Sequence, residues 1–326
     1  MIKAIVLLSG GLDSRLAVKL LQEQGIKVMA LHFLLPFSGC CKPDCAFNFT
    51  QMQGIALKIV NCTEGKNFDE YIKIIKKPKY GYGSGMNPCI DCRIFMLRKA
   101  KDYAKKTKAH FIATGEVLNE RPMSQHSKAL AITERESKLK GKLLRPLSAR
   151  LLPETEVEKK KLVDRNKLLA IKGRSRKQQI ALAKKYNISY PSPAGGCLLC
   201  EKEFVVKLRD LFKHKKRIYP VDVELLKIGR HFRINNTKII VGRNELENKK
   251  LLKLAKRKDI LLEVKNVPSP ITLMQGNGID KIKKAAALTI RYSDVNEGIV
   301  RYGKGKLNKE LKSKALSDKE IDKFRI

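Results

Sequence analysis

The chain has 326 residues and a formal net charge of +37, from 69 lysines and arginines against 32 aspartates and glutamates. Its length suggests about two domains of roughly 150 residues each, and a hydrophobic share of 43% is enough to build their cores. No stretch approaches the roughly 20 apolar residues of a membrane span, and the first residues do not resemble a secretion signal. We therefore expect a cytoplasmic protein with no membrane partner. The excess of positive charge favours a polyanion such as nucleic acid as partner, rather than a merely solvated lysine-rich surface.

Strands and helices alternate along the first part of the chain. Short apolar runs predict strands over 3–8, 27–35, 55–61 and 109–114. Apolar residues at helical spacing predict helices over 14–24 and 94–107. This alternation is typical of an α/β fold with a doubly wound parallel sheet. Phosphate ligands of such folds bind at the carboxyl ends of the strands, near helix N-termini.

The pattern changes near residue 215, after a stretch from 138 to 172 that is rich in Lys, Glu, Leu and Pro. Beyond it, residues 237–244 and 259–265 read as strands and 247–258 as a helix. We expect a first domain over 1–215 and a smaller, basic α+β domain over 216–326. The last twenty or so residues are expected to be a charged helix or tail.

A serine- and glycine-rich loop follows the first strand, with the sequence Ser9-Gly10-Gly11-Leu12-Asp13-Ser14. Glycine N–H groups and the start of the next helix can bind an anion, and the two serines add hydroxyl donors. Asp13 would repel a phosphate unless a metal such as Mg²⁺ lies between them. An ordinary strand–helix turn with Ser and Asp caps is the alternative interpretation.

The SGGLDS loop, placed after the first strand, resembles the pyrophosphate loop of the PP-loop ATPases. That superfamily cleaves ATP to AMP and pyrophosphate and adenylates a carbonyl-type oxygen. The resemblance implies that the ATP phosphates and Mg²⁺ bind Ser9, Gly10, Gly11, Asp13 and Ser14. It also implies that the adenosine lies beside residues at two strand ends, Leu31, His32, Thr114 and Gly115. For His32, a histidine satisfied by its own fold remains an equal alternative.

Eight cysteines occur in a chain expected to be kept reduced, so their paired spacing indicates metal or thiol chemistry rather than disulfides. One pair, Cys89 and Cys92, precedes a predicted helix whose dipole should lower the thiol pKa values. Cys197 and Cys200 follow the glycines at 195 and 196. Three interpretations stay open: a zinc site on all four thiolates, a persulfide with a resolving thiol, and a [4Fe–4S] cluster on Cys89, Cys92 and Cys197 with one open iron. Zinc would give the ATP site nothing to react with, and among the three interpretations we favour the cluster.

The remaining cysteines have weaker indications. Cys40, Cys41 and Cys45 follow the second strand and could form a small metal clip, carry sulfur or have no task, which we rank first. Cys62 lies at a strand end and is expected to pack in the core. If Cys200 were a fourth ligand, it would close the open iron of a cluster.

Several segments together resemble a tRNA thiouridine synthetase-like family that is related to the 2-thiouridylases and 4-thiouridine synthetases. The segments are MNPCIDCRIFML, ATGEVLNERPMSQ, LLRPLSARLLP, GRSRKQQIALAKKY and YPSPAGGCLL, and the resemblance covers about residues 1–212. Cys197 falls where that family carries its persulfide, and Cys92 matches the thiol of the first motif. Cys89 replaces an acid of the 2-thiouridylases. The resemblance therefore implies that Cys89, Cys92 and Cys197 are catalytic.

Two further polar segments belong to the substrate side of the predicted site. Residues 115–126 follow the fourth strand, so Glu116, Arg121, Ser124 and Gln125 are expected to overhang the nucleotide. Arg174, Arg176 and Lys177 lie at a helix start, where cations are unfavourable unless an anion binds there. We expect this cluster to bind RNA phosphate or pyrophosphate.

Residues 237–273 resemble the RNA-binding domain of the fibronectin-binding and ribosome-quality-control proteins, on IVGRN at 240–244, EN at 247–248 and VP at 267–268. The resemblance implies phosphate contacts rather than base reading. The cations expected to make them include Arg243, Lys253, Lys256 and Arg257. A basic helix that is merely solvated is the alternative.

Together these features predict an enzyme that uses ATP to adenylate a uridine oxygen in tRNA and then replaces that oxygen with sulfur. Two alternatives remain: an RNA- or ribosome-binding protein without catalysis, and a PP-loop synthetase acting on a small molecule. The basic second domain argues against the small molecule, and the joint presence of phosphate loop and paired cysteines argues against the pure binding protein. The sulfur donor, the modified position and the oligomeric state, with a homodimer among the options, are not fixed by the sequence.

Overall fold

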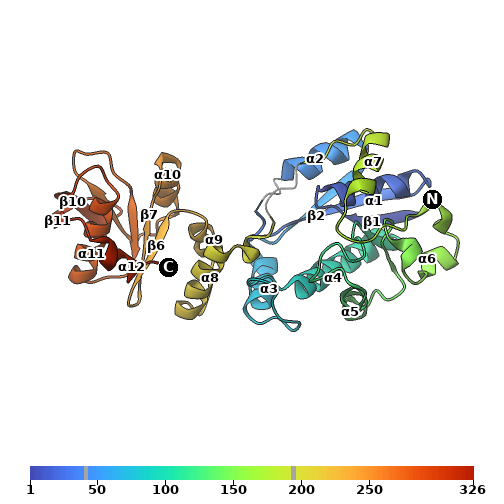
Figure 1. Ribbon diagram of the computed structural model, residues 1–326, viewed down its shortest axis with the longest axis horizontal. Helices are drawn as coiled ribbons and strands as arrows, with labels where there is room; N and C mark the ends of the chain where they lie inside the picture. Colours follow the sequence, from blue (N-terminus) through green and yellow to red (C-terminus); the bar gives the residue numbers. More distant parts are fainter. Residues whose placement is uncertain (40–42, 192–195) are drawn as a thin grey trace. The chain divides into compact units, whose positions relative to one another are not determined.

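The structure is a computed structural model that describes residues 1–39, 43–191 and 196–326. The chain divides into two compact units, Met1–Glu201 and Lys202–Ile326 (Figure 1). The predicted boundary at 215/216 lies further along the chain, because helix α8 (Lys202–His214) belongs to the second unit. Among the described residues, no helix combines the length and the apolar character needed to cross a membrane.

The first unit contains a five-stranded parallel sheet in the order β3-β2-β1-β4-β5. The strands are β1 (Lys3–Leu7), β2 (Lys27–Leu34), β3 (Ala56–Asn61), β4 (Phe111–Thr114) and β5 (Leu143–Leu144). Side chains alternate between the faces, so Ala4 and Val6 enter one core cluster while Ile5 and Leu7 enter another. Both faces are therefore apolar and need covering helices.

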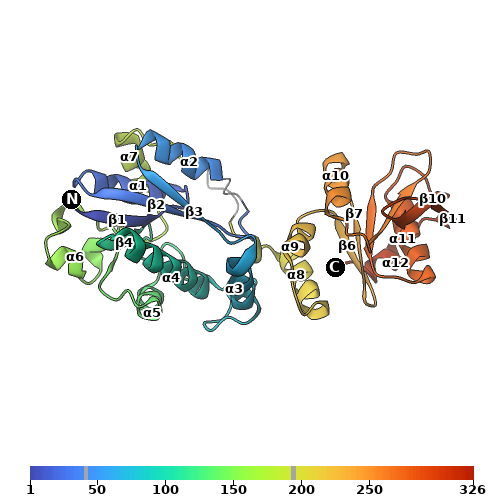
Figure 2. The same cartoon turned by 180° about the vertical axis from the view of Figure 1, so that it is seen from behind.

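Helices cover both faces of this sheet, which confirms the predicted doubly wound α/β class (Figures 1 and 2). On one face lie α1 (Leu12–Gln22), α2 (Pro43–Met52) and α7 (Lys177–Lys185), and on the other α3 (Gly65–Lys76), α4 (Cys89–Thr107) and α5 (Ser127–Ser137). The short helix α6 (Glu156–Lys159) and three 3₁₀ turns over Ala149–Leu151, Arg165–Lys167 and Leu198–Cys200 complete the unit. The fourth helix begins at Cys89 and not at residue 94, so the CxxC motif forms its first turn.

The second unit contains a six-stranded antiparallel sheet in the order β11-β10-β8-β9-β7-β6. Its strands are β6 (Arg230–Ile234), β7 (Thr237–Val241), β8 (Ile260–Val264), β9 (Thr272–Gln275), β10 (Glu297–Lys304) and β11 (Lys309–Lys314). Its helices are α8, α9 (Pro220–Leu226), α10 (Glu245–Leu254), α11 (Ile279–Arg291) and α12 (Asp318–Asp322). Helices and antiparallel strands together confirm the predicted α+β class.

The C-terminal residues are more ordered than a charged tail. Residues 309–314 pair with β10 in antiparallel register, and α12 follows with a capping box at Ser317. Leu316 and Phe324 pack against the same core cluster as Phe232, and Ile321 is buried within it. Apolar side chains spaced among many lysines thus anchor this segment, although its composition alone suggests a solvated tail.

Candidate functional site

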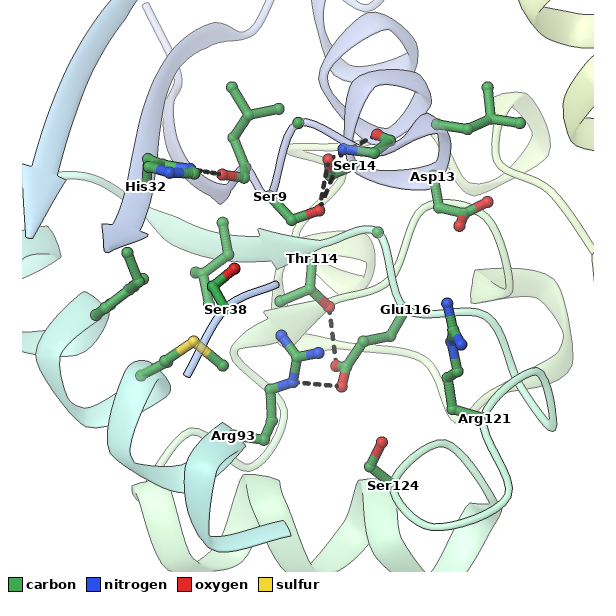
Figure 3. Close-up of a pocket in the computed structure, with 18 of the residues that line it drawn as sticks. Ser9, Asp13, Ser14, His32, Ser38, Arg93, Thr114, Glu116, Arg121 and Ser124 are labelled. Atoms are coloured by element: carbon green, nitrogen blue, oxygen red, sulfur yellow. Dashed lines mark hydrogen bonds and ion pairs between the residues drawn. The ribbon is translucent and has the colours of Figure 1, made fainter. Parts of the chain in front are cut away.

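A cavity of about 420 Å³ opens at the carboxyl ends of β1, β2 and β4 in the first unit (Figure 3). This is where a parallel sheet binds its ligands. All residues expected to bind ATP line the cavity, namely Ser9, Gly10, Gly11, Asp13, Ser14, Leu31, His32, Thr114 and Gly115. The residues expected to overhang it, Glu116, Arg121, Ser124 and Gln125, line it too.

The Ser-Gly loop is shaped by its glycines and by its contact with the end of β4. Gly10 has a φ of +87°, which an L side chain rarely adopts. At Gly115, an added Cβ would lie 2.5 Å from the backbone nitrogen of Ser14, so only glycine allows this approach. The Ser14 hydroxyl donates to the Gly11 carbonyl at 2.8 Å. No side chain caps the start of α1, which leaves N–H groups of its first turn available to an anion.

Two of the carboxylates that line this cavity, Asp13 and Glu120, have a pKa above its ordinary value. Burial raises the pKa of Asp13, although Arg176 opposes that shift. Burial also raises the pKa of Glu120, and the charge of Asp13 raises it further. The Asp13 Oδ1 atom has no hydrogen-bond partner among the described residues. Oxygen ligands in a partly buried, mutually repelling pair suit a hard divalent cation such as Mg²⁺.

His32 is partnered on one side only. It is 2% exposed, and its Nδ1 atom donates to the Leu8 carbonyl at 2.8 Å, since a carbonyl can only accept. That bond makes Nε2 the acceptor nitrogen, and Nε2 has no partner among the described residues. Because the ring lines the cavity, Nε2 is available to a donor on a bound ligand (Figure 3).

A buried ion-pair chain forms the floor opposite the glycine loop. The Glu116 carboxylate accepts from Thr114 at 3.0 Å and from Arg145 Nε at 3.1 Å, and pairs with Arg93 Nε at 3.0 Å (Figure 3). Arg145 also pairs with Glu134. Burial would raise the pKa of Glu116, but Arg93 and Arg145 outweigh it and hold the pKa below its ordinary value. Glu116 is therefore ionised and forms ion pairs with Arg93 and Arg145.

The cation cluster expected at the start of α7 is split by the structure. Arg176 lines the cavity, and its Nε atom has no hydrogen-bond partner among the described residues. Arg174 and Lys177 are exposed and do not line the cavity. Arg176 is thus positioned for a phosphate of a bound nucleotide, whereas its two neighbours face solvent.

The loops that carry the paired cysteines lie together, although about a hundred residues separate them in sequence. The Met86 amide donates to the Leu199 carbonyl at 2.8 Å, and the Leu198 amide donates to Phe37 at 3.0 Å. Charges on Cys92, Cys200 and Cys89 all raise the pKa of Cys197. These three thiols are therefore close enough to Cys197 to act on it electrostatically.

The Cys92 and Cys197 thiols are protonated at neutral pH, so the expected lowering of the Cys92 pKa by the helix start is wrong. Burial raises the pKa of Cys92, although a hydrogen bond of 3.3 Å with the Tyr71 hydroxyl and the charge of Arg93 oppose it. Burial likewise raises the pKa of Cys197 to about 12. Desolvation is the largest effect on both thiols and exceeds any help from the helix dipole.

The cysteines have not adopted the geometry of a metal centre. Among the described residues, no three His, Cys, Asp or Glu side chains are arranged to hold a metal ion. The Cys89 thiol accepts from Asn87 Nδ2 at 3.1 Å, and Cys92 bonds to Tyr71. The donor set of Cys89, Cys92 and Cys197 suits soft-metal chemistry, but its present arrangement does not show a ligand shell.

The other cysteines have separate surroundings. Cys45 lines the cavity, and its Cβ lies 3.5 Å from the position a Cβ would take on Gly10. Cys62 is fully buried, as a packing role requires, and Cys200 is exposed. Cys40, Cys41 and Gly195 lie outside the described residues.

The family model of the tRNA methyl transferase HUP domain matches residues 2–180, which is more than half of the chain. The chain belongs to this family. A second model, the RNA-binding domain of NFACT proteins, matches residues 229–325. Both matches confirm the resemblances seen in the sequence.

Two curated relatives match part of the chain. The tRNA-specific 2-thiouridylase MnmA of Petrotoga mobilis is 31% identical over 138 residues, covering 36% of this chain and 35% of the relative. MnmA of Deinococcus radiodurans is 28% identical over 127 residues, covering 35% of this chain and 32% of the relative. The chain thus spans about a third of the length of the curated relatives it matches.

Solved structures are similar at lower identity. A 4-thiouridine synthetase–RNA complex with bound ATP has a TM-score of 0.42 and 20% identity, covering 69% of this chain and 49% of that chain. The U34-tRNA thiolase NcsA of Methanococcus maripaludis, with its [4Fe-4S] cluster, has a TM-score of 0.35 and 20% identity, covering 69% of both chains.

Sequence reasoning missed two charged side chains of the cavity lining. Arg93 and Glu120 line it, yet neither belongs to the phosphate loop or to the cysteine motif. Arg93 directly follows Cys92, so the first turn of α4 brings one side chain to the thiols and the next to the nucleotide cavity. The sequence shows that Arg93 is adjacent to Cys92, but it does not show on which face of the helix the arginine lies.

Proposed function

We propose that this protein is an ATP-dependent tRNA sulfurtransferase that converts a uridine to a thiouridine. One observation carries the proposal: the first turn of α4 places Cys92 among the thiols and Arg93 in the wall of a nucleotide-sized cavity. An ATP-dependent transfer needs this adjacency, because the activated base and the sulfur must meet. The two curated 2-thiouridylase relatives support the same reaction class.

The cavity residues have defined tasks in the activation step. Backbone N–H groups of the glycine loop and the Arg176 guanidinium bind the ATP phosphates. Asp13, with Glu120 beside it, would hold Mg²⁺, which would neutralise charge on the phosphates. His32 Nε2 accepts a hydrogen bond from the adenosine. The uridine oxygen then attacks the α-phosphorus, pyrophosphate leaves, and the base becomes adenylated.

The thiols carry the sulfur step. Two routes for the sulfur are compatible with these thiols: a persulfide on Cys197, or a cluster that Cys89, Cys92 and Cys197 would hold and that would supply sulfide. With a persulfide, its outer sulfur attacks the activated carbon and AMP leaves. Cys92 then attacks the Cys197 sulfur, which releases the thiouridine and leaves a disulfide for an external thiol to reduce. Because burial keeps both thiols protonated, a base or water must take the thiol proton, and the charge of Arg93 stabilises the Cys92 thiolate that remains.

The second unit binds the tRNA through cationic side chains. Arg243, Lys253, Lys256 and Arg257 lie on or beside α10, where they can contact phosphates without reading bases. Two of them already have partners, since Arg243 pairs with Glu247 and Lys256 lies 3.6 Å from Asp222. We therefore expect Lys253 and Arg257 to contribute more to RNA affinity than the other two.

The experiment measures thiolation and ATP cleavage together. The protein, purified without oxygen, is incubated with unmodified tRNA, ATP and Mg²⁺, in one reaction with sulfide and in another with a donor of persulfide-level (sulfane) sulfur, and nucleosides are analysed by mass spectrometry. Asp13→Asn should reduce both AMP formation and thiouridine at least 100-fold. The control Asp69→Asn, on the exposed part of α3, should change neither. RNA binding without any AMP or thiouridine from the wild-type protein would overturn the proposal in favour of a non-catalytic binding protein.

A further inference from the structure

A second cavity, of about 350 Å³, is formed wholly by residues of the second unit. It is bounded by the end of α8, by α9, by β6 and β7, and by the segments 256–259 and 275–277. None of the residues in the proposed transfer chemistry belongs to it. Its cationic lining residues are Lys215, Arg233, Lys238, Lys256 and Lys258.

The carboxylates around this cavity do not neutralise its cations. Asp210 accepts from both Arg233 and Lys238, at 2.6 and 2.9 Å. Asp222 is shared in the same way between two lysines, at 2.6 and 3.6 Å. Lys258 adds a further positive charge, and Asp259 is the remaining carboxylate of the lining. Five cationic side chains therefore face three carboxylates, which leaves a net positive potential in the cavity.

Lys238 shows the effect of this crowding. Its side chain is 8% exposed, and burial lowers its pKa to about 8 even though Asp210 opposes the shift. Arg233 and Lys207 lower the pKa further through their charges. A bound anion would relieve this repulsion and restore the full charge of Lys238.

His231 adds a hydrogen-bond acceptor to the cationic wall. Its ring is 2% exposed, and Nε2 donates to the Ile228 carbonyl at 2.8 Å. Nδ1 is then the acceptor nitrogen, and it has no partner among the described residues. Burial and the charge of Lys238 hold the pKa of His231 well below its ordinary value, so the ring stays neutral. A phosphate oxygen cannot donate to Nδ1, but a neighbouring hydroxyl can.

The turn after β9 closes the cavity with polar backbone. Gln275, Gly276 and Asn277 line it, and the turn lies close against β7. A Cβ on Gly276 would lie 2.4 Å from the Thr237 hydroxyl, so this approach requires glycine. The cavity thus combines cations, a buried acceptor and amide groups within the space of a single nucleotide unit.

We propose that this cavity binds one ribose-phosphate unit of an RNA backbone, with the phosphate at Lys238 and Lys258 and a sugar hydroxyl at His231 Nδ1. An acidic peptide would satisfy the lysines but would bring no hydroxyl beside its carboxylate. The inference rests only on the RNA-binding part of the proposed function. It also goes beyond the cations of α10, since those bind any phosphate, whereas the acceptor distinguishes RNA from DNA.

The first test compares RNA and DNA binding by the full chain. Fluorescence anisotropy measures the affinity for a labelled single-stranded RNA and for DNA of the same sequence over a series of salt concentrations. Lys258→Glu should weaken RNA binding about tenfold and lower the slope of log K against log salt by about one. Lys312→Glu, the same charge change on exposed β11, is the control and should have less than half that effect.

A second variant examines the acceptor. His231→Phe keeps the ring but removes Nδ1, so it should reduce the preference for RNA over DNA to about one while Lys258→Glu leaves that ratio unchanged. Circular dichroism establishes that each variant is folded. Equal effects of Lys258→Glu and Lys312→Glu, or an unchanged ratio in folded His231→Phe, would overturn the proposal. Loss of thiolation in Asp13→Asn would leave these binding results untouched, so the two proposals fail separately.

A third test asks whether the cavity binds RNA or free inorganic phosphate. It measures how far each ligand protects Lys238 from chemical acetylation, with mass spectrometry as the readout. RNA should protect Lys238 from acetylation, whereas inorganic phosphate at 10 mM or less should give no more protection than chloride of equal ionic strength. Protection by inorganic phosphate equal to that by RNA would assign the cavity to free phosphate and overturn the RNA proposal. Absence of protection by both would overturn it as well.

Discussion

The buried ion-pair chain beneath the nucleotide cavity allows a quantitative test of what holds the site together. Glu116→Gln keeps the shape of the side chain and removes its charge. Among the described residues, Arg145, whose side chain is 2% exposed, would then keep only Glu134 as an anionic partner, and Arg93 would have none. Removing one partner of a buried ion pair destabilises a protein by about 3–5 kcal/mol. For a unit of this size, we expect the melting temperature to fall by roughly 10 °C.

The chain offers a matched control for this change. Glu70 pairs with Lys99 at 2.6 Å, but it is 51% exposed. An exposed pair contributes less than about 1 kcal/mol, because water screens the charges, so Glu70→Gln should shift the melting temperature by no more than about 2 °C. Thermal unfolding followed by circular dichroism compares the two variants. Equal shifts would refute the reasoning that burial, and not the short distance, makes the Glu116 pairs important.

The same carboxylate gives a pH dependence whose sign is fixed. The folded-state pKa of Glu116 lies below its ordinary value, so ionised Glu116 stabilises the fold above the unfolded pKa. That contribution decreases as the pH falls from about 5 toward the folded pKa. Glu116→Gln should therefore unfold with a weaker dependence on pH in this acidic range than the wild-type protein.

Two further predictions concern the loop and the thiols. Gly115→Ala places a Cβ against the backbone of Ser14 and should weaken ATP binding at least tenfold by calorimetry, whereas Gly196→Ala, with open space around it, should not. Unchanged ATP affinity in Gly115→Ala would show that the loop can shift. Tyr71→Phe removes the hydrogen bond that lowers the pKa of Cys92, so alkylation of Cys92 at pH 8 should slow by about threefold. A faster reaction would contradict the assigned direction.

Much of the fold and part of the site follow from local sequence. The strand–loop–helix unit at residues 3–22 is predicted because its apolar period, its glycines and its helix start all act locally. The C-terminal strand β11 is not predicted, because its apolar residues are few and only pairing with β10 makes them buried. The start of α4 is placed five residues late, since Asn87-Pro88 and the cysteines resemble a loop until the helix packs.

The thiol pKa values show why electrostatics is harder to predict than placement. A helix start lowers a thiol pKa only where water or a cation stabilises the thiolate, and burial is a property of the tertiary structure alone. Cys92 illustrates this, since Tyr71, about twenty residues earlier in the sequence, contacts its thiol, and burial raises its pKa. The sequence therefore indicates which thiols meet, while their ionisation depends on packing that no motif encodes.

Arg93 connects the cysteine loops with the cavity of the first unit. It lowers the pKa of Cys92 against burial, and it pairs with Glu116 in the wall of the nucleotide cavity. A ligand phosphate that drew Arg93 away from Cys92 would raise the pKa of that thiol, and one that brought it closer would lower the pKa. A change in the position of Arg93 would thus alter the pKa of Cys92 directly. Because Arg93 is adjacent to Cys92 in the first turn of α4, no domain movement is needed for this coupling.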